Sequence, residues 1–321
     1  MGINNFVVFN DNVRLETIER LNQRIDLFNN SQGMITLSTV EREGDFFEAA
    51  QFDIADAHDT IDIYDTNADR SDTEINMIKQ VDPKVQWVYG PVVWRGAEMA
   101  WINQSESVAL DIVAGRMTNL TFLKMLNNSV AAAVAAYEAN TDVVNDVSAL
   151  GTPQNISQEA LNNTYGLMGD RQNEIVGNLM SAASYNKLIG QALANDNHLF
   201  TSMNVTVIDI QGKASVVADI PALSPTGKNK ILGMKEGAIN CYDGGKLITN
   251  LEVSNGKNMI KSSFQANGNY MINLMGYSWD EANGGKSPLD AELATGTNWD
   301  EYLNYDKNTG GVLLIGDSTV A

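Results

Sequence analysis

The sequence predicts an α+β fold, and three features of the chain lead to this prediction. A single long helix candidate lies between Ser107 and Asn140, and strand-like segments occur on both sides of it. These segments do not alternate regularly with helices, as they would in the βαβ units of a parallel sheet. We therefore expect a mixed fold with strands and helices in separate layers.

Composition sets the scale of the fold and excludes several classes of protein. With 321 residues, 44% of them hydrophobic, the chain can bury the core of one large domain or two medium ones. Its formal charge of −19 repels phosphate backbones. One cysteine and two histidines cannot supply a disulfide or the common zinc ligand sets. We expect no metal, no cofactor and no sequence-specific grip on nucleic acid.

Residues 1–33 are predicted to form an N-terminal arm. The first twelve residues are rich in asparagine and carry the apolar side chains Phe6, Val8 and Phe9, too few to build a core. A short amphipathic helix is expected over 13–28, where apolar residues recur at helical spacing. No basic and apolar leader precedes them, and no apolar run is long enough to span a membrane, so no membrane partner is expected.

Residues 34–104 show no sustained helical period. Strand-like pieces at 34–40, 59–64 and 85–94 are separated by acidic stretches that contain glycine and proline. We expect an extended β-rich region that builds no core of its own and lies across neighbouring molecules. Trp87, Tyr89 and Trp94 fall in its last strand, without interleaved basic residues. They favour a hairpin packed on the long helix or on a neighbour over a nucleic-acid platform.

The long helix dominates the next segment, 105–155. Ordinary helices average about 11 or 12 residues, so a candidate roughly three times that length is informative. An alanine-rich stretch at 131–136 favours helix, and proline is absent. No strict heptad appears, so we predict a single spine helix and not a coiled coil. Its apolar residues at helical spacing are Val108, Ile112, Leu120, Leu123, Leu126, Val130, Val134 and Tyr137.

The remaining part, 156–321, mixes both element types. Ser157 suits the N-cap of a helix that runs to about Met168, and a second helix is expected over 181–194. Asn255-Gly256 is a strong hairpin signal between two strands. The predicted strands are 174–180, 205–210, 214–218, 246–253, 258–272 and 311–315.

Acidic residues raise one alternative function. Aspartate recurs every third residue from Asp53 to Asp65, and the stretch that starts at Asp65 begins like a calcium loop. Its sixth position is Arg70 instead of glycine and its twelfth is Asn76 instead of glutamate, so two defining features fail. An acidic calcium-dependent surface or carbohydrate-binding module stays as the alternative, with the neighbouring aromatic residues as its binding face.

Catalytic motifs fail on spacing. Gly284-Gly285-Lys286-Ser287 lacks the earlier glycine of a phosphate-binding loop, since Asp280 stands there. Gly316-Asp317-Ser318 lies too near the end for a serine-hydrolase turn, and Cys241 and His198 have no nucleophile and base spacing. The sequence therefore predicts no catalytic residue and a protein that is not an enzyme.

The order of these segments, arm, β-rich excursion, spine helix and mixed α/β half, resembles the coat proteins of tailed double-stranded DNA bacteriophages with the Hong Kong 97-like capsid fold. Asn178–Tyr185 resembles a strand-to-helix step of such coats, and Gly276–Trp279, Ser287–Ala294 and Asn298–Trp299 resemble their late segment. The resemblance implies an N-arm at 1–33, an E-loop at 34–104, a P-domain spine helix with the following loop at 105–155, and an A-domain at 156–321 with strands that return to the P-domain.

The resemblance also implies a function. Such a subunit assembles with itself into hexamers and pentamers of an icosahedral capsid around double-stranded DNA, in the virion, after assembly in the host bacterial cytoplasm. Expected partners are a separate scaffolding protein, a portal and a decoration protein. The expected assembly-interface residues are Phe6, Val8, Phe9, Trp87, Tyr89 and Trp94. An encapsulin-like compartment shell shares the fold and is the second alternative.

Overall fold

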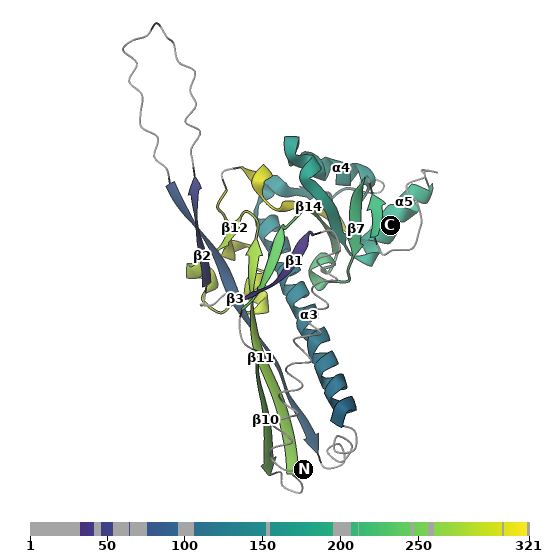
Figure 1. The fold of residues 1–321 in the computed structure, drawn as a ribbon. Coiled ribbons are helices and arrows are strands. Elements are labelled where there is room, and N and C mark those ends of the chain that lie inside the picture. The colour runs from purple at the N-terminus through teal and green to yellow at the C-terminus, as the bar shows by residue number, and fades with distance from the viewer. Residues whose placement is uncertain are drawn as a thin grey trace.

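The computed structural model describes residues 33–41, 46–53, 64, 76–95, 106–151, 155–194, 207–210, 212–244, 247–255, 260–303 and 305–319. Two β-sheets and one long helix, α3, make up most of this structure (Figure 1). Residues 1–32 of the arm predicted at 1–33, its helix at 13–28 and almost all of the strand predicted at 59–64 lie outside the described residues. The α+β class is confirmed.

Helix α3 (Glu106–Ala139) has 34 residues and agrees with the helix predicted over 107–140. Its buried hydroxyl groups bond back to the helix itself: Thr118 Oγ1 donates to Ala114 O over 2.8 Å, and Ser129 Oγ donates to Met125 O over 2.6 Å. These bonds allow polar side chains on the buried side without loss of hydrogen bonding. None of the described helices is long and apolar enough to cross a membrane.

The other helices are short. They are α4 (Gln158–Gly166), α5 (Ala182–Ala194), α6 (Glu281–Gly284) and α7 (Asp290–Leu293), with short 3-10 helices η1 (Thr141–Val143), η2 (Gly169–Glu174), η3 (Pro221–Leu223), η4 (Gly296–Asn298) and η5 (Asp306–Asn308). Helix α4 begins as predicted, because the Ser157 hydroxyl accepts a hydrogen bond from Ala160 N over 3.0 Å.

A six-stranded sheet forms the part of the molecule that carries α4 and α5 (Figure 1). Its strands, in spatial order, are β4 (Val144–Asp146), β14 (Gly311–Asp317), β8 (Lys228–Lys235), β5 (Ile175–Met180), β7 (Lys213–Val217) and β6 (Val207–Ile210). Strand β14 is buried throughout from Gly311 to Gly316, as expected for a continuous apolar run with packed neighbours on both faces.

An eight-stranded sheet forms the elongated part of the molecule. Its main path is β1 (Ile35–Glu41), β9 (Ile239–Asp243), β11 (Ile260–Leu274), β12 (Tyr277–Trp279) and β13 (Trp299–Glu301), with β2 (Phe46–Asp53), β3 (Asn76–Arg95) and β10 (Ile248–Asn255) attached to it. Strand β11 organises the sheet, because β3 pairs along one of its edges and β10 and β9 pair along the other. The predicted hairpin around Asn255 is confirmed by the antiparallel pairing of β10 with β11.

A bulge interrupts the pairing of β3 with β11. The register shifts between Phe264 and Ala266, opposite Gly90 and the cis peptide bond that joins it to Pro91. Gly90 has a φ of +95°, and a Cβ at this position would lie 2.5 Å from Phe264 O, so the close approach requires glycine. Because the bulge changes the alternation of the strand, Tyr89 and Trp94 both turn toward Phe264 despite their odd sequence separation.

One prediction needs correction. The region 34–104 was expected to build no core, yet its described strands β1 and β3 contribute fully buried side chains to the main core. Long-range pairing explains the difference, because β1 lies beside β9 and β3 lies beside β11. Their partners are more than a hundred residues away, so no local pattern marks these strands as central. The buried residues are Met34, Ile35, Leu37, Val81, Val85 and Trp87.

Candidate assembly surfaces

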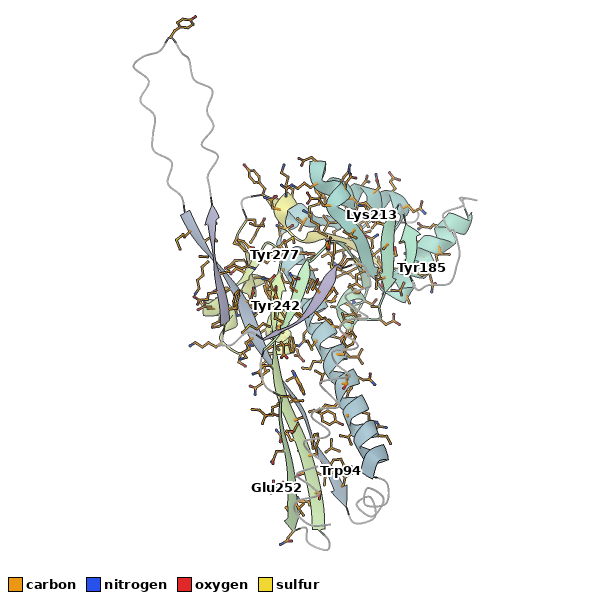
Figure 2. All side chains as sticks on the ribbon, in the orientation of Figure 1. Trp94, Tyr185, Lys213, Tyr242, Glu252 and Tyr277 are labelled. Carbon is orange, nitrogen blue, oxygen red and sulfur yellow. The ribbon has the colours of Figure 1, made fainter. Side chains whose placement is uncertain are left out.

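The predicted interface aromatics on β3 belong partly to the subunit's own core. Trp87 is only 8% exposed and packs against Gly268 of β11. Tyr89 and Trp94 are half-buried, with ring centroids 6.4 and 6.3 Å from that of Phe264. Figure 2 shows Trp94 near the far end of the ribbon formed by β3, β10 and β11. Trp87 therefore supports the sheet, while Tyr89 and Trp94 keep part of their surface accessible.

The N-terminal members of the predicted interface, Phe6, Val8 and Phe9, lie outside the described residues. So do His58, His198 and the aspartates of the acidic repeat other than Asp53, which ends β2. Within the described ranges, no group of three or more His, Cys, Asp or Glu side chains could hold a metal ion.

Cys241 is a buried residue of β9, with its Sγ 2.8 Å from Ser129 Oγ on α3. Burial raises the pKa of the thiol to about 11, and the Ser129 hydrogen bond offsets only part of this effect. A nucleophilic cysteine needs a lowered pKa and access to substrate. Cys241 has neither, and it packs as a core side chain.

The face of α3 that carries the predicted apolar residues is divided along its length. In the second half of the helix, Val130, Val134 and Tyr137 on this face are buried. In the first half, Ile112, Leu120 and Leu123 are 42%, 54% and 50% exposed. These positions share one side of a helix at 3.6 residues per turn. Helix α3 contacts both β9 and β14, so the second half is enclosed by both sheets.

Two strands of the elongated sheet also carry exposed apolar side chains. On β3, Val88 is 53% exposed and Val93 is 42% exposed, on the side of the strand away from Phe264. On β10, Ile248 is 65% exposed and Val253 is 48% exposed. Strand β10 pairs only with β11 among the described strands, which leaves its outer edge open. An open edge and apolar side chains together offer a surface for another protein chain.

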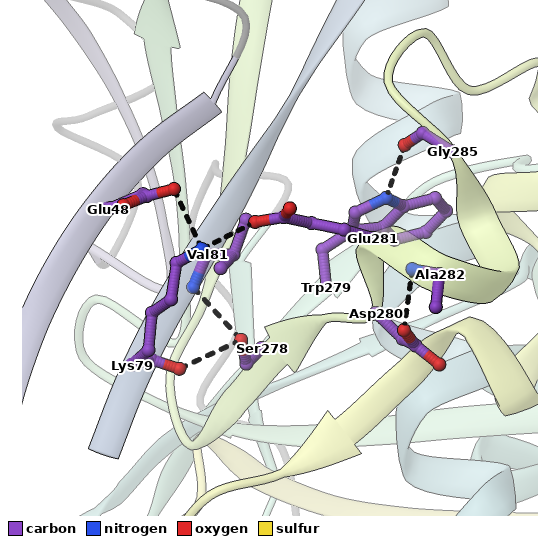
Figure 3. Close-up of polar contacts among 9 residues, drawn as sticks. All are labelled: Glu48, Lys79, Val81, Ser278, Trp279, Asp280, Glu281, Ala282 and Gly285. Atoms are coloured by element: carbon purple, nitrogen blue, oxygen red, sulfur yellow. Dashed lines mark hydrogen bonds and ion pairs between the residues drawn. The ribbon is translucent and has the colours of Figure 1, made fainter. Parts of the chain in front are cut away.

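The root of the β2–β3 hairpin is fixed to the rest of the sheet by polar contacts (Figure 3). Lys79 Nζ lies 2.8 Å from a carboxylate oxygen of Glu48 on β2 and 2.8 Å from one of Glu281 on α6. The hydrogen bond to Glu281 raises the pKa of Lys79 most, and the hydrogen bond to Glu48 raises it further. Val81 N donates to Ser278 Oγ over 2.9 Å, in a buried position. These contacts therefore attach the described part of β3 to β12 and α6.

Similar polar contacts hold α3 against the elongated sheet. Lys124 Nζ lies 2.7 Å from Asp290 Oδ2, and Asn128 Nδ2 donates to Asp290 Oδ1 and to the Tyr270 hydroxyl, each over 2.8 Å. The hydrogen bond from Lys124 is the main cause that lowers the pKa of Asp290. These contacts connect α3, α7 and β11.

Comparison with known proteins agrees with this geometry. The capsid asymmetric unit of cyanophage Pam1 is similar in structure, with a TM-score of 0.56 and 11% identity over 91% of each chain. The holo-SrpI encapsulin complex of Synechococcus elongatus is also similar, with a TM-score of 0.50 and 12% identity over 88% of this chain and 85% of that one. At these identities the likeness shows the fold, which is the Hong Kong 97-like capsid fold.

Sequence comparison gives the family. No curated protein has a sequence significantly similar to this chain. A family model described as major capsid protein 13-like matches residues 5–313, nearly the whole chain. The exposed apolar surfaces and the capsid fold are what a structural shell subunit requires. The chain therefore belongs to the major capsid protein 13-like family.

Proposed function

We propose that this chain assembles into hexamers and pentamers of an icosahedral phage capsid that encloses double-stranded DNA, and that it catalyses no reaction. The observation that carries the proposal is the exposed apolar stripe Ile112, Leu120 and Leu123 on α3. A helix face that is apolar along its length but covered over only half of it suits a subunit that is completed by its neighbours. Membership of a major capsid protein family supports the same conclusion.

The segments are proposed to act as in other shells of this fold. Residues 1–33 serve as the N-arm, 34–104 as the E-loop region, 105–155 as the spine of the P-domain and 156–321 as the A-domain with strands that return to the P-domain. Phe6, Val8 and Phe9 contribute to the interface from the arm. Tyr89 and Trp94 contribute through the exposed parts of their half-buried rings, and Trp87 supports them from within.

The partners follow from the shell function and the charge. A formal charge of −19 makes the packaged DNA a neighbour without sequence-specific contacts, because phosphates are repelled. A separate scaffolding protein, a portal and a decoration protein are the other proposed partners. The proposed location is the virion capsid, after assembly in the host bacterial cytoplasm.

An encapsulin-like compartment is the second candidate, because SrpI shares the fold. The two functions differ in contents, since a phage shell holds DNA and an encapsulin holds cargo protein. The family match favours the phage capsid. Nuclease protection of DNA in purified shells distinguishes the two, and protein cargo without DNA would support the encapsulin.

Electron microscopy of the chain co-expressed with its scaffolding protein tests the proposal. We expect closed shells from the unchanged chain and a soluble, folded subunit without shells from the double variant Leu120→Asp/Leu123→Asp, because charges on an apolar contact oppose its burial. Asn163→Asp, an exposed change on α4, is the control and leaves assembly intact. A chain that stays monomeric under every condition, or shells of normal yield from the double variant, would contradict the proposal.

A further inference from the structure

Two carboxyl groups and one amide meet where α3 ends. Asn140 Nδ2 donates to Glu301 Oε2 over 2.7 Å and to Asp306 Oδ1 over 2.9 Å. Glu301 is the last residue of β13, and Asp306 begins η5. Asn140 caps η1, because its Oδ1 accepts a hydrogen bond from Asp142 N over 3.1 Å. One amide thus holds carboxyl groups from two separate segments.

The position of this cluster connects the two sheets. Strand β13 is the terminal strand of the main path through the eight-stranded sheet, whereas η1 leads directly into β4 of the six-stranded sheet. Asn140 lies between the end of α3 and η1. A change in the bonds among these three side chains therefore acts on the link between the sheets.

The negative charges around Glu301 all raise the pKa of its carboxyl group. Partial desolvation raises the pKa of this largely exposed glutamate to about 7, and the charge of Asp306, a hydrogen bond with Asp306 and the charge of Asp142 add to the effect. Tyr277, whose hydroxyl lies 3.5 Å from Asn140 Nδ2, has a raised pKa and stays neutral. Lys307 follows Asp306 in sequence but pairs with Asp170 over 3.2 Å.

A second tyrosine, Tyr137, lies beside Tyr277. The Tyr137 ring lies 5.5 Å from the Tyr277 ring, between centroids, and the Tyr137 hydroxyl is buried without a hydrogen-bond partner in the described part of the chain. An unpaired buried hydroxyl opposes the folded packing.

We propose that Asn140, Glu301 and Asp306 form a proton-dependent joint between the two sheets, closed while the carboxyl groups share a proton and loosened when that proton leaves. In the closed state one carboxyl donates to the other and both accept from Asn140. When the proton is lost, two carboxylates of like charge face each other beside Asp142, and repulsion favours separation of β13 and η5 from the end of α3.

The direction of the pH effect follows from linkage. The closed joint retains a proton that an opened joint releases above the ordinary glutamate pKa of 4.5. Opening is therefore favoured progressively as the pH rises from that value toward 7, and the full effect is present above 7. The joint is closed in acid and loosened in mildly alkaline solution.

Hydrogen exchange of the full chain, followed by mass spectrometry and corrected for the intrinsic pH dependence of exchange, tests the proposal. Between pH 5.5 and 8 we expect roughly tenfold loss of protection in peptides that cover 140–146 and 299–309. Glu301→Gln, which cannot ionise, removes most of this loss. Glu159→Gln, an exposed change in the first turn of α4, is the matched control and retains it.

A second variant keeps the test decisive if Glu301→Gln does not fold. Asp306→Asn removes one of the two charges that face Glu301, so the loss of protection shifts to lower pH. Equal pH dependence in the unchanged chain and in either variant overturns the proposal. A loss of protection spread equally over β5, which is distant from the joint in sequence, overturns it as well.

Discussion

The indole ring of Trp279 packs edge-on against that of Trp299, with ring centroids 4.9 Å apart and an interplanar angle of 74°. The two residues are cross-strand partners on β12 and β13. Trp279 Nε1 donates to Gly285 O and Trp299 Nε1 donates to Leu293 O, each over 3.0 Å. Both rings thus bury their apolar surface while their polar atoms are satisfied.

Trp279→Ala is expected to destabilise the subunit by about 3–5 kcal/mol, because it removes a nearly fully buried indole and leaves a cavity. Urea unfolding followed by circular dichroism measures the loss. Trp94→Ala is the control, since that ring is only half-buried and its removal is expected to have a smaller effect. Equal losses in the free energy of unfolding for the two variants would contradict a larger contribution of the Trp279–Trp299 pair to stability.

Gly268→Ala tests the contact between β11 and the Trp87 ring. A Cβ at Gly268 would overlap Cζ2 and Cε2 of Trp87, so we expect a loss of about 1–3 kcal/mol from overpacking. In the double variant Gly268→Ala/Trp87→Leu the smaller side chain makes room, and the combined loss should be less than the sum of the single losses. Additive losses, measured by urea unfolding, would contradict direct contact.

Two variants at the root of the β2–β3 hairpin compare the stability contributed by a buried hydrogen bond with that contributed by exposed ion pairs. Ser278→Ala leaves the buried Val81 N without its side-chain acceptor, and we expect a loss of about 1–3 kcal/mol in thermal or urea unfolding. Lys79→Met is expected to leave the unfolding midpoint nearly unchanged, because its carboxylate partners are well exposed to solvent. A larger effect from Lys79→Met than from Ser278→Ala would reverse this ranking.

Cys241 is expected to react slowly with a thiol reagent such as DTNB in the native subunit at pH 8. Its pKa of about 11 leaves about 0.1% of the thiol ionised at that pH, and the side chain is buried. The visible absorbance of the coloured thiolate released from DTNB measures the extent of the reaction. The urea-unfolded chain is the control and should react at once, whereas rapid labelling of the native subunit would show that β9 opens readily.

The two halves of α3 should respond differently to truncation on the same face. Val134→Ala is expected to destabilise the subunit by about 1.5–3 kcal/mol, because it removes buried methyl groups from an enclosed position. Leu120→Ala removes more atoms but from a half-exposed side chain, and its effect in the free subunit should stay below about 1 kcal/mol. Urea unfolding of the dispersed subunit compares them, and the opposite order would refute the assignment of the faces.

Much of the fold could be predicted from local patterns. The spine helix at 106–139, α4 behind its Ser157 cap, the strand at 175–180 and the strand at 311–317 all appear within a few residues of their expected bounds. Each has a strong local cause, such as absence of proline, an alanine-rich run, a capping hydroxyl or a continuous apolar stretch. The catalytic and phosphate-binding motifs were rejected on the spacing of neighbouring residues, which the sequence alone also provides.

The predicted interface was harder to read. Trp87, Tyr89 and Trp94 look alike in the sequence, yet the first is a core residue and the others are half-buried. The three rings share one face of β3, and the difference arises from their place along the strand: Trp87 packs on Gly268 near the core, whereas Tyr89 and Trp94 lie farther along the ribbon beside Phe264. Exposed apolar residues on α3 were recognised only as part of a regular helical pattern, because periodicity shows which residues share a face but not what covers that face.

Local sequence therefore determines where the helices and strands form, and long-range pairing determines which of their side chains are buried or brought together. Asn140, Glu301 and Asp306 carry no motif, because they come together only when β13 and η5 fold back on the end of α3. The same helix face is buried at Val134 and open at Leu120 for the same reason. Helix propensity and capping act over a few residues, whereas burial and shared protons depend on which distant strands pair, and that is a property of the folded chain.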